Sequence, residues 1–140
     1  MKPVQLPIFD QPTLNISADL TRAMHDAVKK SDMSREQIVD RMNDLADRYG
    51  VRMVNGNTTK LTMTTFEKWI NPDDLSRQIP LRALPVFCAA IGRPDICDII
   101  LKPLSCRVIG HEDISLLKWA KAYFRQKQAA REMRELEKFI

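Results

Sequence analysis

The chain is poor in the residues from which catalytic and metal sites are usually built. Its 140 residues include four glycines, with no glycine-rich phosphate loop, and two histidines, with no His-x-x-x-His pair. The three cysteines, Cys88, Cys97 and Cys106, contain no Cys-x-x-Cys motif, and we expect Cys88 and Cys97 to be structural thiols in apolar helices. We therefore predict no metal site, no cofactor and no enzymatic activity.

Long apolar runs are also missing. No stretch approaches the roughly 18 residues of a membrane span, and the N-terminus lacks a basic-then-apolar signal sequence. Strand patterns are confined to Val51–Val54 and a short Asn-Gly turn. The sequence thus predicts a mainly α-helical cytoplasmic protein with no membrane association.

The composition fits a folded domain with an appendage. Hydrophobic residues make up 44% and charged residues 29%, which is ordinary for a globular protein, and the length allows a real core. The net charge of +4 and pI near 9.1 suit a nucleic-acid binder without establishing one.

Residues 33–49 have the pattern of an amphipathic helix with a defined start. Ser34 and Gln37 form a capping-box pair, in which each side chain caps a backbone N–H of the first turn. The apolar positions then recur on one face of a 3.6-residue period: these are Ile38, Met42, Leu45, Ala46 and Tyr49. Gly50 is the expected terminating glycine.

Residues 61–71 predict a second, shorter helix. Thr62 is the expected N-cap, Phe66 and Trp69 are expected in the core, and Asn71-Pro72 ends the helix. Its other face carries small polar groups beside a cation, the mixture that base edges and phosphates require.

Together the two stretches resemble the helix-turn-helix of the lambda-repressor/Cro-like (XRE) DNA-binding family. That family's first motif helix typically reads Leu-Ser-x-x-x-Val-Ala-x-x-Met, and Met33–Met42 follows the pattern closely. Leu81–Ile91 with Gly92, and then Pro94–Leu101, resemble its fourth and fifth helices. The resemblance covers residues 17–101 and implies a five-helix DNA-binding domain, with residues 17–31 as a scaffold helix whose Leu20, Met24, Ala27 and Val28 face the core.

The chain departs from this family between the two motif helices, which the family joins by about four residues. Here Val51–Lys60 forms an insert with Asn55-Gly56 at its centre, the signal of a tight hairpin. The insert is either a small wing that adds phosphate contacts through Arg52 and Lys60 or a solvated loop that leaves the motif intact.

Residues 1–16 are expected to form an extended arm, because Pro3, Pro7 and Pro12 prevent a helix. Within the arm, Gln5–Phe9 resembles the short Gln-Leu-x-Leu-Phe peptides that dock on the bacterial DNA sliding clamp. The alternative is that Leu6, Ile8 and Phe9 fold back onto the helical core.

Residues 102–140 are expected to form a connector, with a short extended piece at Leu104, Cys106 and Val108, followed by a long helix from about Asp113 to Lys138. The first half of this helix is apolar enough to be buried on the domain. The second half is charged, with a narrow stripe of Met133, Leu136 and Ile140 that has no obvious use in a monomer. We expect this helix to mediate a homodimer.

The resemblance implies a function as a sequence-specific regulator of transcription that binds double-stranded DNA, of the kind common in phages and prophages. It assigns Thr62, Met63, Thr64 and Lys68 to base edges in the major groove, and Arg35 and Asn71 to flanking contacts near the backbone. The alternative is a protein-interaction module that keeps the scaffold without reading DNA. Met63 and Glu67 favour that alternative, since a thioether forms no strong bond to a base and a carboxylate is repelled by phosphates.

Overall fold

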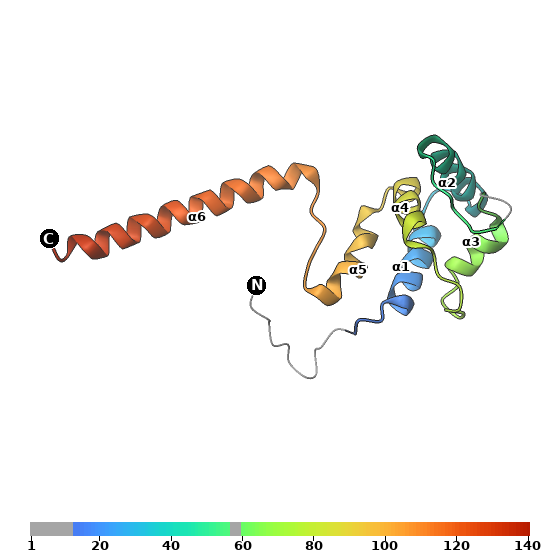
Figure 1. Cartoon of the computed structure of the whole chain (residues 1–140), viewed down its shortest axis with the longest axis horizontal. Coiled ribbons are helices and arrows are strands. Elements are labelled where there is room, and N and C mark those ends of the chain that lie inside the picture. Colours follow the sequence, from blue (N-terminus) through green and yellow to red (C-terminus); the bar gives the residue numbers. More distant parts are fainter. Residues whose placement is uncertain (1–12, 57–59) are drawn as a thin grey trace. The chain divides into compact units, whose positions relative to one another are not determined.

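The computed structural model describes residues 13–56 and 60–140, and these residues are mainly helical, as predicted (Figure 1). No strand occurs within them. The chain divides into two compact units, one reaching to Val108 and the other spanning Ile109–Ile140. The division falls a few residues later than the expected boundary at 101.

The first unit begins with helices α1 (Ser17–Lys30) and α2 (Arg35–Tyr49). The predicted stripe on α1 is buried, together with the side chain of Thr21. At the start of α2 both halves of the capping box form: the Ser34 hydroxyl accepts from Gln37 N at 3.2 Å, and the Gln37 side chain accepts from Ser34 N at 2.9 Å. Gly50 ends α2 in the left-handed region with φ of 67°, a conformation that favours glycine.

The short helix α3 (Met63–Trp69) follows, and then a 3-10 turn, η2 (Leu81–Ala83), leads into α4 (Leu84–Ile91). Pro85 lies in the first turn of α4, where its missing N–H is not needed. Gly92 closes α4 with φ of 75°, as predicted from its place after the last apolar residue.

The region after Gly92 is less regular than expected. Pro94 opens a 3-10 turn, η3 (Pro94–Cys97), which continues as a single turn of α-helix, α5 (Asp98–Leu101), and a second 3-10 turn, η4 (Lys102–Leu104). The predicted extended connector is therefore wrong at its start, because Lys102–Leu104 continues the helical path. Ser105 then breaks this path with φ of 56°.

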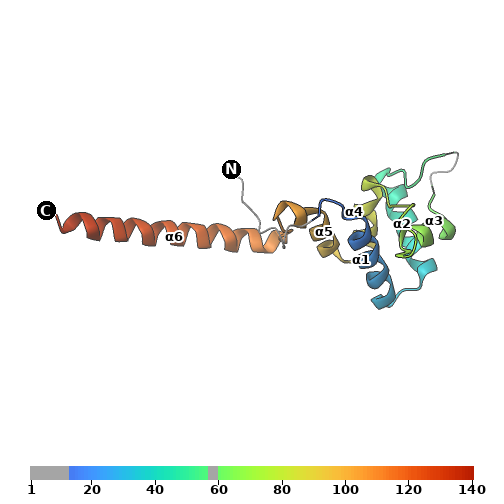
Figure 2. The ribbon, with the colours of Figure 1, turned by 90° about the horizontal axis from the view of Figure 1, so that it is seen from below.

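One apolar core unites the helices of this unit, whose ribbon Figure 2 shows from a second direction. Phe66 and Phe87 lie in it with ring centroids 6.3 Å apart and are fully buried. α1, α2, α3 and α4 all contribute side chains to it, among them Met24, Ile38, Met42, Phe66, Trp69, Phe87 and Ala90. The prediction that Tyr49 belongs to this face is wrong, since Tyr49 is 72% exposed, and Val39 is buried instead.

The first residues of the insert are packed on the core. Met53 is fully buried, and Val51 and Val54 pack against the core; Leu61, the first residue after the insert, is 3% exposed. No strand forms over residues 51–56, so the expected hairpin is not observed there; residues 57–59 lie outside the described part of the chain. Residues 51–56 thus form a loop that supplies core side chains.

The second unit is dominated by α6 (His111–Glu137), one uninterrupted helix of 27 residues. Its start and end match the predicted helix within two residues. Within this unit nothing covers the apolar side chains: Leu116, Trp119 and Phe124 are 63%, 63% and 70% exposed, and no residue of the helix is buried.

Within the part of the chain that is described, no helix combines the length and the apolar character needed to cross a membrane. The peptide Gln5–Phe9, which resembles a sliding-clamp ligand, falls outside the described residues.

Candidate nucleic-acid interface

The start of α3 is fixed by an asparagine on α2. Asn43 Nδ2 donates to Leu61 O at 2.9 Å, and Leu61 N donates to Asn43 Oδ1 at 2.8 Å. We call this pair of bonds the Asn43–Leu61 bridge. It joins the residue before the α3 N-cap to the middle of α2 and so ties the start of α3 directly to α2.

The inner face of α3 is seated in the core. Phe66 is fully buried, Trp69 is 5% exposed, and Ile70, just past the helix, is 1% exposed. The Thr62 hydroxyl accepts from Thr65 N at 3.3 Å and caps the first turn, as predicted. The burial of Trp69 confirms that it is a core residue and not a surface for stacking bases.

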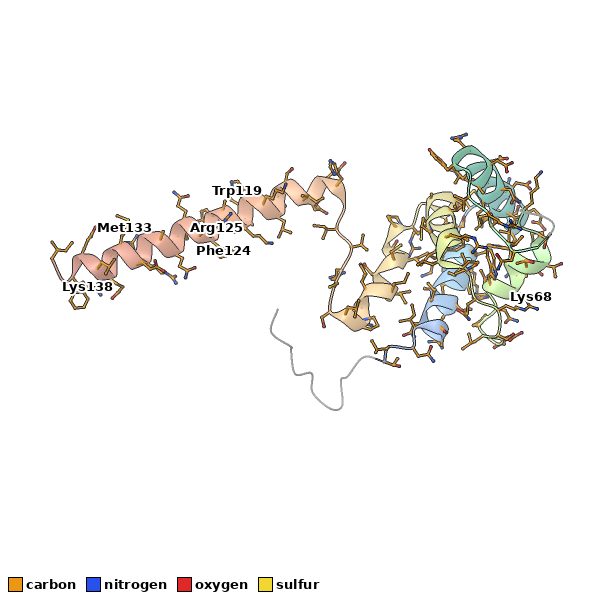
Figure 3. The ribbon with its side chains drawn as sticks, viewed as in Figure 1. Lys68, Trp119, Phe124, Arg125, Met133 and Lys138 are labelled. Atoms are coloured by element: carbon orange, nitrogen blue, oxygen red, sulfur yellow. The ribbon has the colours of Figure 1, made fainter. Side chains whose placement is uncertain are left out.

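The outer face of α3 presents Thr64, Glu67 and Lys68, all exposed, next to the exposed cap Thr62. Figure 3 shows the Lys68 side chain projecting outward from this helix. Thr64 and Lys68 are four residues apart and therefore lie on one side of the helix. Four of the residues predicted to contact DNA, Thr62, Thr64, Lys68 and Arg35, are exposed on α3 or at the start of α2.

Arg35 joins this surface from the first turn of α2. One of its guanidinium nitrogens lies 3.8 Å from a carboxylate oxygen of Glu67, and both side chains are about half exposed. Such an exposed ion pair contributes little to stability. The contact shows only that the guanidinium lies within reach of α3.

Asn71 lies at the end of the same surface. Its side-chain oxygen accepts from Asp73 N at 3.0 Å in a local turn. A hollow of about 390 Å³ lies between α3 and the helices beside it, and its lining joins several of the predicted residues. The lining residues are His25, Arg35, Glu67, Ile70, Asn71, Pro72 and Asp73.

Met63 differs from the other predicted contact residues. It is only partly exposed and packs against the core from the first position of α3. We expected it to point away from the core together with Lys68, and Lys68 alone does so. The structure therefore places Met63 more as a support for the helix than as part of its outer face.

Acidic groups also lie close to the outer face. Hydrogen bonds from the Ser76 side chain and backbone, with the positive charges of Arg77 and Lys68, hold the pKa of Asp74 below its usual value. Lys68 therefore has an anionic neighbour as well as the nearby Glu67. The surface is mixed in charge rather than uniformly basic.

Two arginines brace the insert that precedes α3. Arg52, expected as a phosphate ligand, donates through Nε to Val54 O at 3.1 Å and through Nη2 to Gly56 O. Arg82 of η2 donates to Arg52 O at 2.6 Å and to Asn55 Oδ1 at 2.9 Å. Both guanidinium groups thus donate hydrogen bonds to oxygen atoms of the loop.

Sequence reasoning missed the Asn43–Leu61 bridge, although one signal for it is present. Asn43 follows Met42 and precedes Leu45 and Ala46 on the inward side of α2, and asparagine is a poor residue for a helix interior. A polar group in such a position needs a partner, and the first residue after the insert supplies it.

The cysteines occupy three different environments. Cys88 on α4 is buried, and its sulfur lies 3.9 Å from that of the half-buried Cys97. Burial, with Cys97 as neighbour, raises the pKa of Cys88 to about 12. Cys106 is exposed. The prediction of a structural thiol is confirmed for Cys88 and holds in part for Cys97.

Comparison of the chain with protein-family models, with curated proteins and with solved structures gives no match.

Proposed function

We propose that the chain binds double-stranded DNA sequence-specifically and acts as a cytoplasmic regulator of transcription. The proposal includes a lambda-repressor-like arrangement in which α2 and α3 are the two motif helices. The observation that carries it is the way α3 is held. The Asn43–Leu61 bridge fixes its first turn, Phe66 and Trp69 anchor one side, and the opposite side stays exposed. A recognition helix requires this combination of rigid placement and open outer face.

In this proposal the outer residues divide into base and phosphate contacts. Thr64 lies in the first turn of α3, where a hydroxyl reaches a base edge as donor or acceptor. Lys68, one turn later, contacts a phosphate or a guanine edge. Arg35 serves the phosphate backbone once it separates from Glu67, whose carboxylate then accepts from a cytosine amino group.

The test begins with selection of an operator from random duplex DNA by the full chain. Titrations at two salt concentrations then compare the wild type with Lys68→Ala. If Lys68 contacts a phosphate, the variant weakens binding to all sequences alike and lowers the salt slope by about one unit. If it contacts guanine, the loss is roughly 1–3 kcal/mol on the selected operator, with relaxed preference at one base pair.

A matched control is Lys29→Ala, which removes an exposed lysine from α1 and changes the net charge equally. Lys29→Ala should leave both affinity and preference close to wild type. Thr64→Ala should change specificity more than affinity, because a neutral hydroxyl contributes little to counterion release. The proposal fails if no operator can be selected, or if Lys68→Ala and Thr64→Ala both bind like the wild type.

A second candidate function is a protein-interaction module on the same scaffold. The partial burial of Met63 and the carboxylates of Glu67 and Asp74 favour it, since they reduce the groups on α3 that attract DNA. Failure of the operator selection with a correctly folded chain would make this second candidate the better one.

A further inference from the structure

Some of the apolar side chains of α6 form an interrupted seam along one side of the helix, which Ile140 extends just past its end. Leu116, Trp119, Tyr123, Ala130, Met133 and Ile140 follow one another at spacings of three, four or seven residues, and all are exposed. This is the 3.5-residue repeat of a coiled coil, with the polar Gln126 and Glu137 at the two remaining positions. In Figure 3, Trp119 and Met133 project from one side of α6, and Phe124 and Lys138 from the other.

The contacts inside α6 do not account for this seam. Trp119 stacks on Tyr123 with ring centroids 5.4 Å apart, and the Lys127 ammonium lies 5.1 Å from the centroid of Tyr123. These contacts cover the rings only partly, because Trp119 remains 63% exposed and Tyr123 41% exposed. Most of the stability of a helix in a protein comes from packing of its apolar face, so this seam calls for a partner surface.

We propose that α6 pairs with α6 of a second copy of the chain in an antiparallel two-stranded coiled coil, centred between Tyr123 and Gln126. This proposal stands independently of DNA binding. In this register Leu116 faces Met133 of the second copy, Trp119 faces Ala130, and Tyr123 faces Gln126. The two-fold axis repeats each contact.

Side-chain size favours this orientation. Trp119 is the largest residue of the seam and Ala130 the smallest, so the antiparallel register places the indole against the space that the alanine leaves. The register also lets the Tyr123 hydroxyl and the Gln126 amide meet as hydrogen-bonding partners. A parallel pair would instead oppose two tryptophans in one layer and two alanines in another, giving one crowded layer and one void.

One charge pair at the flanks points the same way, whereas the seam layer of Glu112 and Glu137 opposes like charges in either orientation and does not decide between them. The antiparallel register brings Asp113, in the first turn of one helix, beside Arg134 of the other copy, and the symmetry repeats this attraction at the far end. Small residues flank the centre, where Ala122 lies opposite Ala129. A parallel pair would set Arg134 beside Ala129 and would lose the attraction. Antiparallel helices also align their dipoles favourably.

Cysteine cross-linking tests the orientation. Full-length Leu116→Cys and Met133→Cys variants are prepared in a Cys106→Ser background, oxidised singly and as a mixture, and the linked peptides identified by mass spectrometry. Each chain carries only one of the two introduced cysteines, so a 116–133 link can form only between two chains. We expect a 116–133 link in the mixture and no 116–116 or 133–133 link in the single variants.

A matched pair of substitutions tests the seam by sedimentation. Ala130→Glu places a carboxylate against Trp119 of the second copy and should raise the dimer dissociation constant at least tenfold. Gln128→Glu makes the same charge change on the opposite side of α6 and should leave the dissociation constant nearly unchanged.

Three results would each overturn the proposal: disulfide links that join identical positions, equal effects of the two substitutions, or a wild type that is monomeric at tens of micromolar. A monomer that instead binds anionic vesicles through the cations between Lys118 and Arg131 of α6 is one form of the last result.

Discussion

The two tryptophans of the chain occupy helices with similar apolar patterns and opposite surroundings. Trp69 of α3 is 5% exposed and lies in a core built by several helices, whereas Trp119 of α6 is 63% exposed. A periodic pattern identifies which face of a helix is apolar, but it does not identify what covers that face. The same reasoning from sequence is confirmed for the core face of α3, and for the first half of α6 it identifies an apolar face without a covering partner inside its own unit.

The largest expected change in the free energy of unfolding distinguishes the surroundings of the two tryptophans. Trp69→Ala should lower the free energy of unfolding of the first unit by roughly 3–5 kcal/mol, because it leaves a cavity in a packed core. Trp119→Ala should leave that free energy unchanged. Urea unfolding followed by circular dichroism measures the first variant, and fluorescence of the remaining Trp69 measures the second. If the two substitutions destabilise the first unit equally, the contrast between the helices is wrong.

Loss of the Asn43–Leu61 bridge should have the next largest effect on the free energy of unfolding. Asn43→Ala removes both bonds and leaves the partly buried N–H and C=O of Leu61 without these partners, at a cost of about 1–3 kcal/mol. Asn71→Ala, which removes one hydrogen bond in an exposed turn, is the control and should cost under about 0.5 kcal/mol. Denaturant unfolding of both variants compares them. A cost for Asn43→Ala as small as that of the control would mean that α3 is held by its core side chains alone.

A smaller effect is expected at the start of α2. Ser34→Ala removes the hydroxyl that caps this helix and should cost about 1 kcal/mol of stability in the first unit. Ser115→Ala removes an exposed hydroxyl within α6 and should change that stability by no more than a few tenths of a kcal/mol. Thermal unfolding of the two variants shows the difference, and equal melting temperatures would contradict it.

The last comparison is of the reaction rates of the three thiols in the unaltered protein, so it involves no change in stability. Cys106 should react first with a soluble thiol reagent, the half-buried Cys97 more slowly, and Cys88 only on unfolding, since burial raises its pKa to about 12. Peptide mapping after brief alkylation gives the order. Early modification of Cys88 would show that the packing around α4 opens readily.

The sequence predicted those features of the first unit that depend on residues close together in the chain. The capping box at Ser34, the glycines at 50 and 92, and the burial of Phe66 and Trp69 all depend on residues within a few positions of one another. The pattern also set Thr64 and Lys68 on the exposed face of α3, and both are exposed. Helix termini and amphipathic faces are fixed by short-range chemistry, so a sequence shows them.

Features that join distant segments were not predictable in this way. The bridge between Asn43 and Leu61, the bracing of the insert by Arg82, and the burial of Met53 each depend on where the chain returns in space. Met63 shows the same limit, because its partial burial follows from contacts that its position in the sequence does not reveal. Tertiary packing overrides local pattern at these sites.

The length of α6 has a consequence for the proposed pair of chains. With 27 residues at about 1.5 Å each, the helix is roughly 40 Å long. In an antiparallel pair the first turns of the two α6 helices lie at opposite ends. The length of α6 therefore sets the distance between the two points where the first units are attached. One turn of DNA spans about 34–36 Å between half-sites. Removing one heptad from α6 would shorten this separation by about 10 Å, so that, under the proposed DNA binding, the length of α6 would set the spacing of the half-sites.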